Sequence, residues 1–79
     1  MRVEWVKWQD SRAVEPSWFE IADIHSTKLD ALESVGFVAG EDDDRLILVT
    51  SYDPHMEKVS SGTIIPKVAI LKRKVLRGR

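Results

Sequence analysis

Cysteine is absent from this sequence of 79 residues, which excludes both a disulfide framework and a thiolate metal site. A chain of this length has room for one hydrophobic core, whose net contribution to stability is small. We therefore expect residues 1–79 to form a single domain with a loose basic tail at residues 77–79. We also expect the protein to gain stability by self-association, because no other device for reinforcing a small core is present.

Long apolar segments are missing as well. No window approaches the roughly 20 consecutive apolar residues that a membrane-spanning helix needs. The first ten residues, MRVEWVKWQD, are charged within the first four positions and contain no continuous apolar stretch, unlike a signal peptide. These absences predict a cytoplasmic protein that has no membrane partner.

Signatures of catalysis and of metal binding are also missing. The two histidines, His25 and His55, are thirty residues apart and lack the short spacing of a local metal pair. The acidic run at residues 41–44 lacks the alternating ligands, the glycine and the distant glutamate of a calcium loop, so it indicates a solvated turn. No strand-turn-helix elbow exposes a serine as a nucleophile. We therefore expect no enzymatic activity, no metal and no cofactor.

Short segments with the alternation of β-strands are what the chain does contain. Gly36 predicts a bulge or a sharp bend that curls the sheet, and Pro66 predicts a tight corner with a single 3₁₀ turn. Residues 41–44 predict a hairpin turn, and residues 53–57 a connection opened by Asp-Pro. The expected strands are residues 3–8, about 32–39, 46–52, about 58–65 and about 69–76.

A short helix is expected before the second strand, from about Ser17 to His25. Ser17 and Glu20 have the spacing of a capping box, and the apolar residues from Trp18 to His25 recur at helical spacing. Such a helix can lie across a sheet or cover the end of a barrel. Residues 26–33 are compatible with either helix or strand. The whole pattern predicts a mainly β fold, a small curled barrel of five strands with one short N-terminal helix.

Charge is distributed unevenly along the chain. Residues 1–66 hold all 13 acidic side chains and six basic ones, whereas residues 67–79 hold six basic and no acidic side chains. A basic terminus suits a contact with nucleic acid, but it also suits docking on the acidic body of a neighbouring subunit. Subunit docking is the favoured interpretation, because an acidic body repels a phosphate backbone.

A group of polar side chains surrounds the second hairpin and the Pro66 corner. Hydroxyl and lysine donors suit a phosphate or a ribose, and a tryptophan ring can stack on a nucleobase. The alternative is that the hydroxyls face solvent on an edge strand and that the tryptophans pack in the core. The candidate ligand-binding residues are Trp18, Tyr52, His55, Ser61, Thr63 and Lys67. Among them, Lys67 is expected to meet phosphate.

Two segments carry a resemblance to a known family, SVGFVAGEDDDRLILVTSYD (residues 34–53) and GTIIPKVAILKRKVL (residues 62–76). They resemble a family of small bacteriophage and prophage proteins of uncharacterised activity, over about residues 3–76, and IPKVAI is the most specific part. Length, strand rhythm and the late corner also look like the Sm-like or SH3-like barrel. The resemblance implies a phage-encoded protein of the host cytoplasm. It further implies rings in which the last strands of one subunit pair with the sheet of the next.

Three hypotheses follow for the function. The first is an oligomeric binding protein that sequesters a small nucleotide ligand, a host anti-phage immune signal, without catalysis. The second is an Sm-like ring that binds RNA or single-stranded DNA, although the RNA-binding loop of Sm proteins is missing. Its basic residues would be Lys72, Arg73, Lys74, Arg77 and Arg79. The third is an inhibitor of a host defence protein. A steep loss of affinity with salt separates the second from the first.

Overall fold

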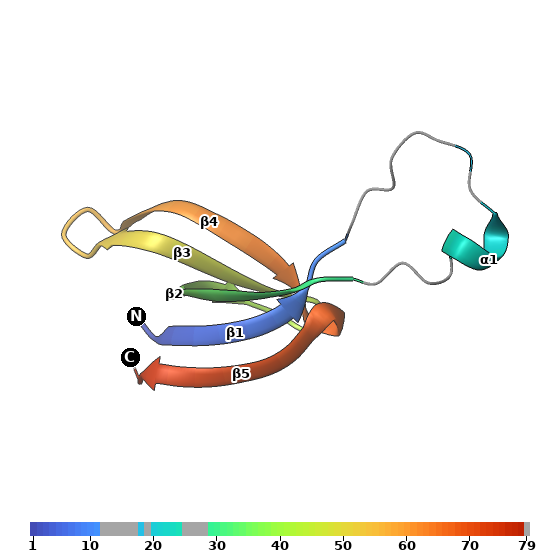
Figure 1. Ribbon diagram of the computed structural model, residues 1–79. Helices are drawn as coiled ribbons and strands as arrows, with labels where there is room; N and C mark the ends of the chain where they lie inside the picture. The colour runs from blue at the N-terminus through green and yellow to red at the C-terminus, as the bar shows by residue number, and fades with distance from the viewer. Residues whose placement is uncertain (12–17, 19, 25–28, 79) are drawn as a thin grey trace.

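A computed structural model describes residues 1–11, 18, 20–24 and 29–78, and its strands form one antiparallel sheet (Figure 1). The elements are β1 (Val3–Gln9), α1 (Ile21–Ile24), β2 (Ala31–Glu41), β3 (Arg45–Asp53), β4 (Lys58–Pro66), η1 (Lys67–Ala69) and β5 (Ile70–Arg77). The strand order is β4-β3-β2-β1-β5, so β4 and β5 are the edge strands. The predicted mainly β class is confirmed. Within the described residues the sheet is not closed into a barrel, because no ladder joins β4 to β5.

The predicted strands agree with the observed ones to within two residues at each end. The acidic turn connects β2 and β3, and the 3₁₀ turn η1 directly follows Pro66, as the sequence predicts. Of residues 26–33, which the sequence left open between helix and strand, residues 31–33 belong to β2, residues 29 and 30 belong to neither, and residues 26–28 lie outside the described part. Arg77, expected in a loose tail, is instead the last residue of β5 and is paired with Val3.

The predicted N-terminal helix is not confirmed. The described part contains only the four-residue α1, and the proposed ends of the helix, Ser17 and His25, lie outside it. Trp18 and Ile21, expected to cover the sheet, have relative exposures of 101% and 76%. A helix of one turn has too few internal hydrogen bonds and too little apolar surface to dock by itself. No helix in the described part is long and apolar enough to cross a membrane.

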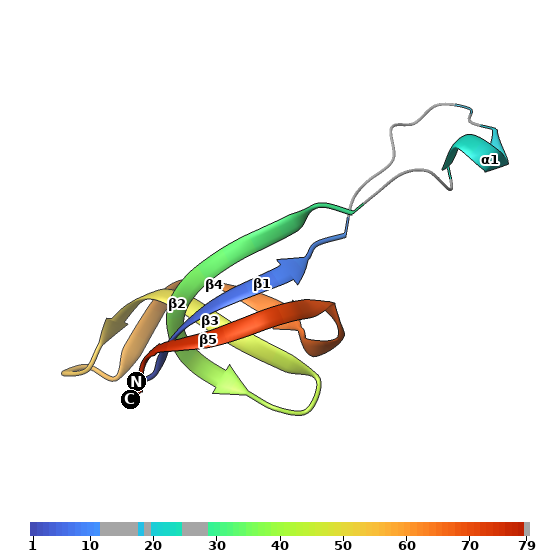
Figure 2. The same cartoon turned by 60° about the horizontal axis from the view of Figure 1, so that its bottom comes forward.

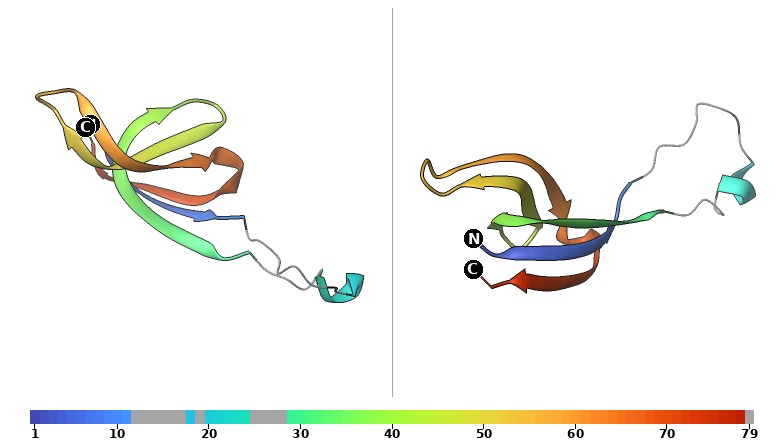
Figure 3. Two further views of the ribbon diagram at one scale, coloured as in Figure 1. Left: turned by 90° about the horizontal axis from the view of Figure 1, so that it is seen from above. Right: turned by 60° about the vertical axis from the view of Figure 1, so that its left-hand side comes forward.

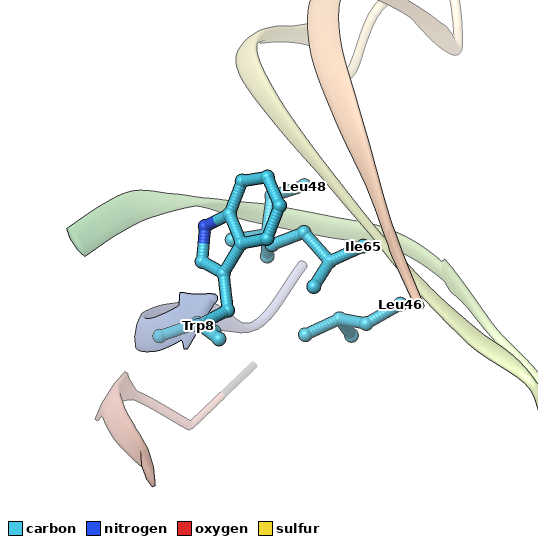
Figure 4. Packing of buried hydrophobic residues seen from close by; sticks show 5 residues of the cluster. Trp8, Leu46, Leu48 and Ile65 are labelled. Atoms are coloured by element: carbon cyan, nitrogen blue, oxygen red, sulfur yellow. The ribbon is translucent and has the colours of Figure 1, made fainter. Parts of the chain in front are cut away.

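The hydrophobic core lies on the inner face of the curled sheet. Alternate residues of β1 are buried, among them Val6 and Trp8, and they meet Leu46, Leu48 and Ile65 from β3 and β4 (Figure 4). The indole of Trp8 donates a hydrogen bond of 3.0 Å to the Ser34 hydroxyl on β2, which satisfies its only polar group. The core therefore forms where β1 faces the β3–β4 hairpin.

Two glycines allow the sheet to curl this tightly (Figures 2 and 3). A Cβ atom on Gly36 would lie 2.7 Å from the Val49 carbonyl oxygen, and one on Gly62 would lie 2.5 Å from the Leu48 carbonyl oxygen. The β1–β2 register is unbroken at Gly36, so the bulge predicted there is absent from this strand pair, and the glycine instead allows a close approach of β3. A register irregularity of β2 occurs later, between Val38 and Gly40.

A methyl group at Gly36 should destabilise the fold. We expect Gly36→Ala to lower the free energy of unfolding by about 1–3 kcal/mol, because a backbone carbonyl must move to admit the new atom. Urea denaturation followed by tryptophan fluorescence measures this loss. Gly78→Ala is the control, since a Cβ there has no atom within 4 Å. Equal denaturation midpoints for the two variants would contradict the close contact between β2 and β3.

Candidate functional site

The six residues predicted to bind a ligand do not converge within one subunit. Four of them belong to the β3–β4 hairpin or its turn, whereas Lys67 lies in η1 at the opposite end of β4 (Figure 1). Trp18 lies on the connection between β1 and β2. The hairpin residues are Tyr52, His55, Ser61 and Thr63. A pocket made from all six is therefore not present in a single chain.

Two of the four hairpin candidates, Tyr52 and His55, make contacts within the fold. The Tyr52 ring packs edge-on against Phe37, with ring centroids 6.0 Å apart. The backbone amide of His55 donates to the Asp53 carboxylate at 2.9 Å, which orders the turn. Ser61 has a positive φ of 54°, and its exposed side chain, like that of Thr63, makes no hydrogen bond within the described residues. The hydroxyls of Ser61 and Thr63 are thus exposed and free of hydrogen bonds to other described residues.

Lys67, which was expected to meet phosphate, is paired with a carboxylate in the structure. Its ammonium group lies 2.7 Å from the Glu41 carboxylate, and its side chain is only 28% exposed. Proline at position 66 turns the chain so that η1 reaches the β2–β3 turn, where the Lys67 amide also donates to the Asp44 carbonyl at 2.8 Å. Lys67 therefore fastens this corner of the fold.

Lys67 belongs to a larger group of charges that we call the inner ionic cluster, formed by Arg2, Glu4, Glu41, Lys67 and Arg73. Glu4 is almost completely buried, with 1% of its surface exposed. Arg73 donates two hydrogen bonds of 2.9 Å to the Glu4 carboxylate, from Nε and Nη2. The same guanidinium donates to Glu41 at 2.9 and 3.1 Å, and Arg2 contacts both carboxylates. Three cations thus enclose two carboxylates.

The inner ionic cluster stabilises the fold and leaves little capacity for a ligand. Hydrogen bonds from Arg73 hold the pKa of Glu4 below its usual range, and those from Arg73 and Lys67 do the same for the pKa of Glu41. An open hollow of about 370 Å³ adjoins the cluster, with Val75 as its apolar wall. Because the charged groups around it satisfy one another, we assign this hollow to structure.

The position of Arg73 determines which β5 side chains face the other way. Side chains alternate along a strand, so Lys72 and Lys74 lie on the face opposite Arg73. Lys72 is paired with Lys7 and Lys74 with Trp5 in the β1–β5 ladder, and paired residues share a face. We call this surface the basic outer face and define it by Trp5, Lys7, Lys72 and Lys74. Its neighbours on β2 are Glu33 and Val35.

The lysines of the basic outer face, Lys7, Lys72 and Lys74, take part in no ion pair within residues 1–11, 18, 20–24 and 29–78. Lys7 and Lys72 face each other directly, an arrangement that destabilises an antiparallel pair. Glu33 lies across from Lys7, but its carboxylate accepts the indole hydrogen bond of Trp5 at 2.9 Å. With Glu33 included, the face still carries a net charge of +2, from three lysines and one glutamate.

Aromatic side chains also lie beside the basic outer face, near the start of β1 and the end of β5. The Arg77 guanidinium lies 5.6 Å from the centre of the Phe37 ring, a cation–π contact, and the same ring packs against Tyr52. Val3 is the ladder partner of both Phe37 and Arg77, which places all three on the same side as Trp5. Aromatic and cationic side chains therefore recur along this side of the sheet.

The acidic turn between β2 and β3 is organised by hydrogen bonds. The Asp42 carboxylate accepts from the amides of Asp44 and Arg45 at 2.9 and 3.0 Å, and these bonds hold its pKa below the usual range. Its second oxygen lies 3.1 Å from Nε of Arg45. Within the described part, no group of three or more His, Cys, Asp or Glu residues is arranged to hold a metal ion.

The chain matches no protein-family model, no curated protein and no solved structure. The resemblance to phage proteins therefore stays a prediction. The choice among the three hypotheses rests on the geometry of the chain.

From the sequence, Trp5 was one of three tryptophans that could stack on a nucleobase, but neither Trp5 nor Lys7 was among the candidate ligand-binding residues. The basic terminus was treated as one group, whereas the structure separates Arg73 from its neighbours Lys72 and Lys74. The sequence did contain one relevant signal: Trp5 and Lys7 alternate with Val6 and Trp8, so the two pairs occupy opposite faces of the strand. The missing information was the register that brings β5 beside β1.

Acid should weaken the fold through the inner ionic cluster. The pKa of Glu41 is lower in the folded chain than its usual value of 4.5, so its contribution is complete above that pH and is lost as the pH falls towards the folded pKa. We expect the urea midpoint of the wild type to fall between about pH 6 and about pH 3. The urea midpoint of Glu41→Gln should be lower than that of the wild type at about pH 6 and should decrease less on acidification. The midpoint of Asp43→Asn should change with pH as that of the wild type does. Parallel curves for Glu41→Gln and the wild type would contradict this role.

Proposed function

We propose that the protein is a non-catalytic nucleic-acid-binding module that uses the basic outer face. The observation that carries the proposal is the direct opposition of Lys7 and Lys72, which form no ion pair within the described residues. Two adjacent cations reduce the stability of the free protein, and a phosphate backbone removes this cost by neutralising both. Glu33, on the other side of Lys7, offsets this repulsion only in part, and a local conflict of this kind is expected at functional sites.

The acidic net charge of the chain does not oppose this proposal. Glu4 and Glu41 are neutralised on the inner side by Arg73 and its neighbours. Among the other carboxylates, those of residues 42–44, Asp53 and Glu57 lie in or beside the two hairpin turns, and those of Asp10, Glu20 and Asp30 lie between β1 and β2. The basic outer face therefore presents a local positive charge to an approaching polyanion. Such a field raises the rate of association at low salt.

A second candidate is the sequestering oligomer, in which two subunits build one nucleotide site. The favouring observation is that β4 and β5 are both edge strands and that exposed apolar residues, Ile64 and Leu71, lie on them. A β5 strand of another copy beside β4 would bring lysines close to the exposed hydroxyls of Ser61 and Thr63. Native mass spectrometry with a pool of linear and cyclic nucleotides tests this candidate. A monomer that retains no nucleotide would exclude it.

Lys72→Glu should make the fold more stable and the binding weaker. The new carboxylate would face Lys7, and we expect the free energy of unfolding to rise by about 0.5 kcal/mol. Affinity for a labelled oligonucleotide at about 50 mM salt should fall roughly tenfold. The slope of log affinity against log salt concentration should become shallower by the amount expected for about one phosphate contact. Fluorescence anisotropy measures the affinity and urea denaturation the stability.

Lys58→Glu is the matched control for this charge reversal. Lys58 is exposed on β4 and is paired with Asp53, so the variant places two carboxylates opposite each other. Its stability should fall slightly while its affinity changes little. Unchanged affinity in Lys72→Glu, or an equal loss in both variants, would contradict the basic outer face as the binding surface.

A further inference from the structure

We propose that the basic outer face selects single-stranded nucleic acid, with the bases stacked on Trp5 and the phosphates following β5. This inference rests on the proposed function and names its ligand class. It requires an aromatic platform within reach of the cations, and Trp5 supplies one because it lies on β1 between β2 and β5.

The Trp5 ring is held in place with its polar edge satisfied. Its indole nitrogen donates to Glu33 at 2.9 Å, and its side chain is only partly buried. The neighbour on β2 is Val35, which has a relative exposure of 57%. An exposed valine beside a fixed, partly exposed indole forms an apolar strip on a surface that otherwise carries lysines. Nucleobases stack on such strips without needing a particular sequence.

The order of side chains across the sheet determines how a bound strand would be oriented on it. From β2 to β5, one row of the ladder reads Val35, Trp5, Lys74, and the next reads Glu33, Lys7, Lys72. The apolar and aromatic groups therefore lie towards β2, and the cations lie towards β5. Lys72 and Lys74 are two residues apart on one strand, so their α-carbons are separated by about 7 Å along β5. A single backbone running along β5 can contact both lysines while its bases turn towards Trp5.

A duplex cannot make the same set of contacts. Its bases are stacked inside the helix, so a partly exposed indole on a sheet face would meet only sugars and phosphates. The lysines would still attract the duplex through its charge, but the contact between Trp5 and a base would be lost. We therefore expect a preference for single strands that depends on Trp5 and an affinity for either form that depends on the lysines.

The test compares an oligodeoxythymidine of about 12 nucleotides with a duplex of the same length, both fluorescently labelled. Trp5→Leu should weaken binding of the single strand roughly tenfold and leave the weaker duplex binding nearly unchanged. Trp5→Phe keeps an aromatic ring and should retain most of the affinity. Trp18→Leu is the matched control, because Trp18 is fully exposed on a different part of the chain. Circular dichroism of each variant checks that the sheet is intact.

The outcomes separate the two proposals. If Lys72→Glu weakens binding and Trp5→Leu does not, or if the wild type binds duplex as tightly as single strand, single-strand selection is wrong and nucleic-acid binding stands. If the wild type binds neither form but binds vesicles that contain phosphatidylglycerol, both proposals are wrong and the lysines recognise an anionic surface of another kind. Quenching of tryptophan fluorescence by the single strand, lost in Trp5→Leu and kept in Trp18→Leu, supports stacking on Trp5.

Discussion

The paired hydrogen bonds between Arg73 and Glu4 determine which face of β5 each side chain occupies. Glu4 is buried, so it requires a cationic partner, and an isolated buried carboxylate would be strongly destabilising. Arg73 satisfies this requirement from the strand beside β1 and reaches Glu41 with the same guanidinium. One side chain thereby fastens the first strand, the last strand and the β2–β3 turn to one another.

The charged surface follows from this internal pairing. With Arg73 directed inward, strand alternation directs Lys72 and Lys74 outward, where they meet Lys7 and Trp5. The same strand thus supplies Arg73 to the inner ionic cluster and Lys72 and Lys74 to the basic outer face. The opposition of Lys7 and Lys72 lowers stability.

Much of the fold could be predicted from the sequence, and most of the candidate site could not. The strands and the Pro66 corner are local features, visible in alternation and in a residue that fixes its own φ. The contacts that define the site join distant residues, since Glu4 and Arg73 are separated by 69 positions. The ion pair between Lys67 and Glu41 also joins residues that are distant in sequence, so the sequence did not show that a carboxylate lies beside Lys67. Trp18 was assigned to a helix longer than the one observed.

The central claim is that the outer face of β1 and β5 binds nucleic acid. A titration of isotope-labelled protein with an oligodeoxythymidine, followed by amide and indole resonances in two-dimensional NMR, tests it most directly. We predict that the largest shifts occur at the Trp5 indole and at the amides around Lys7, Lys72 and Lys74. Shifts confined to Tyr52, Ser61 and Thr63 would contradict the claim and would place the site on the β3–β4 hairpin instead.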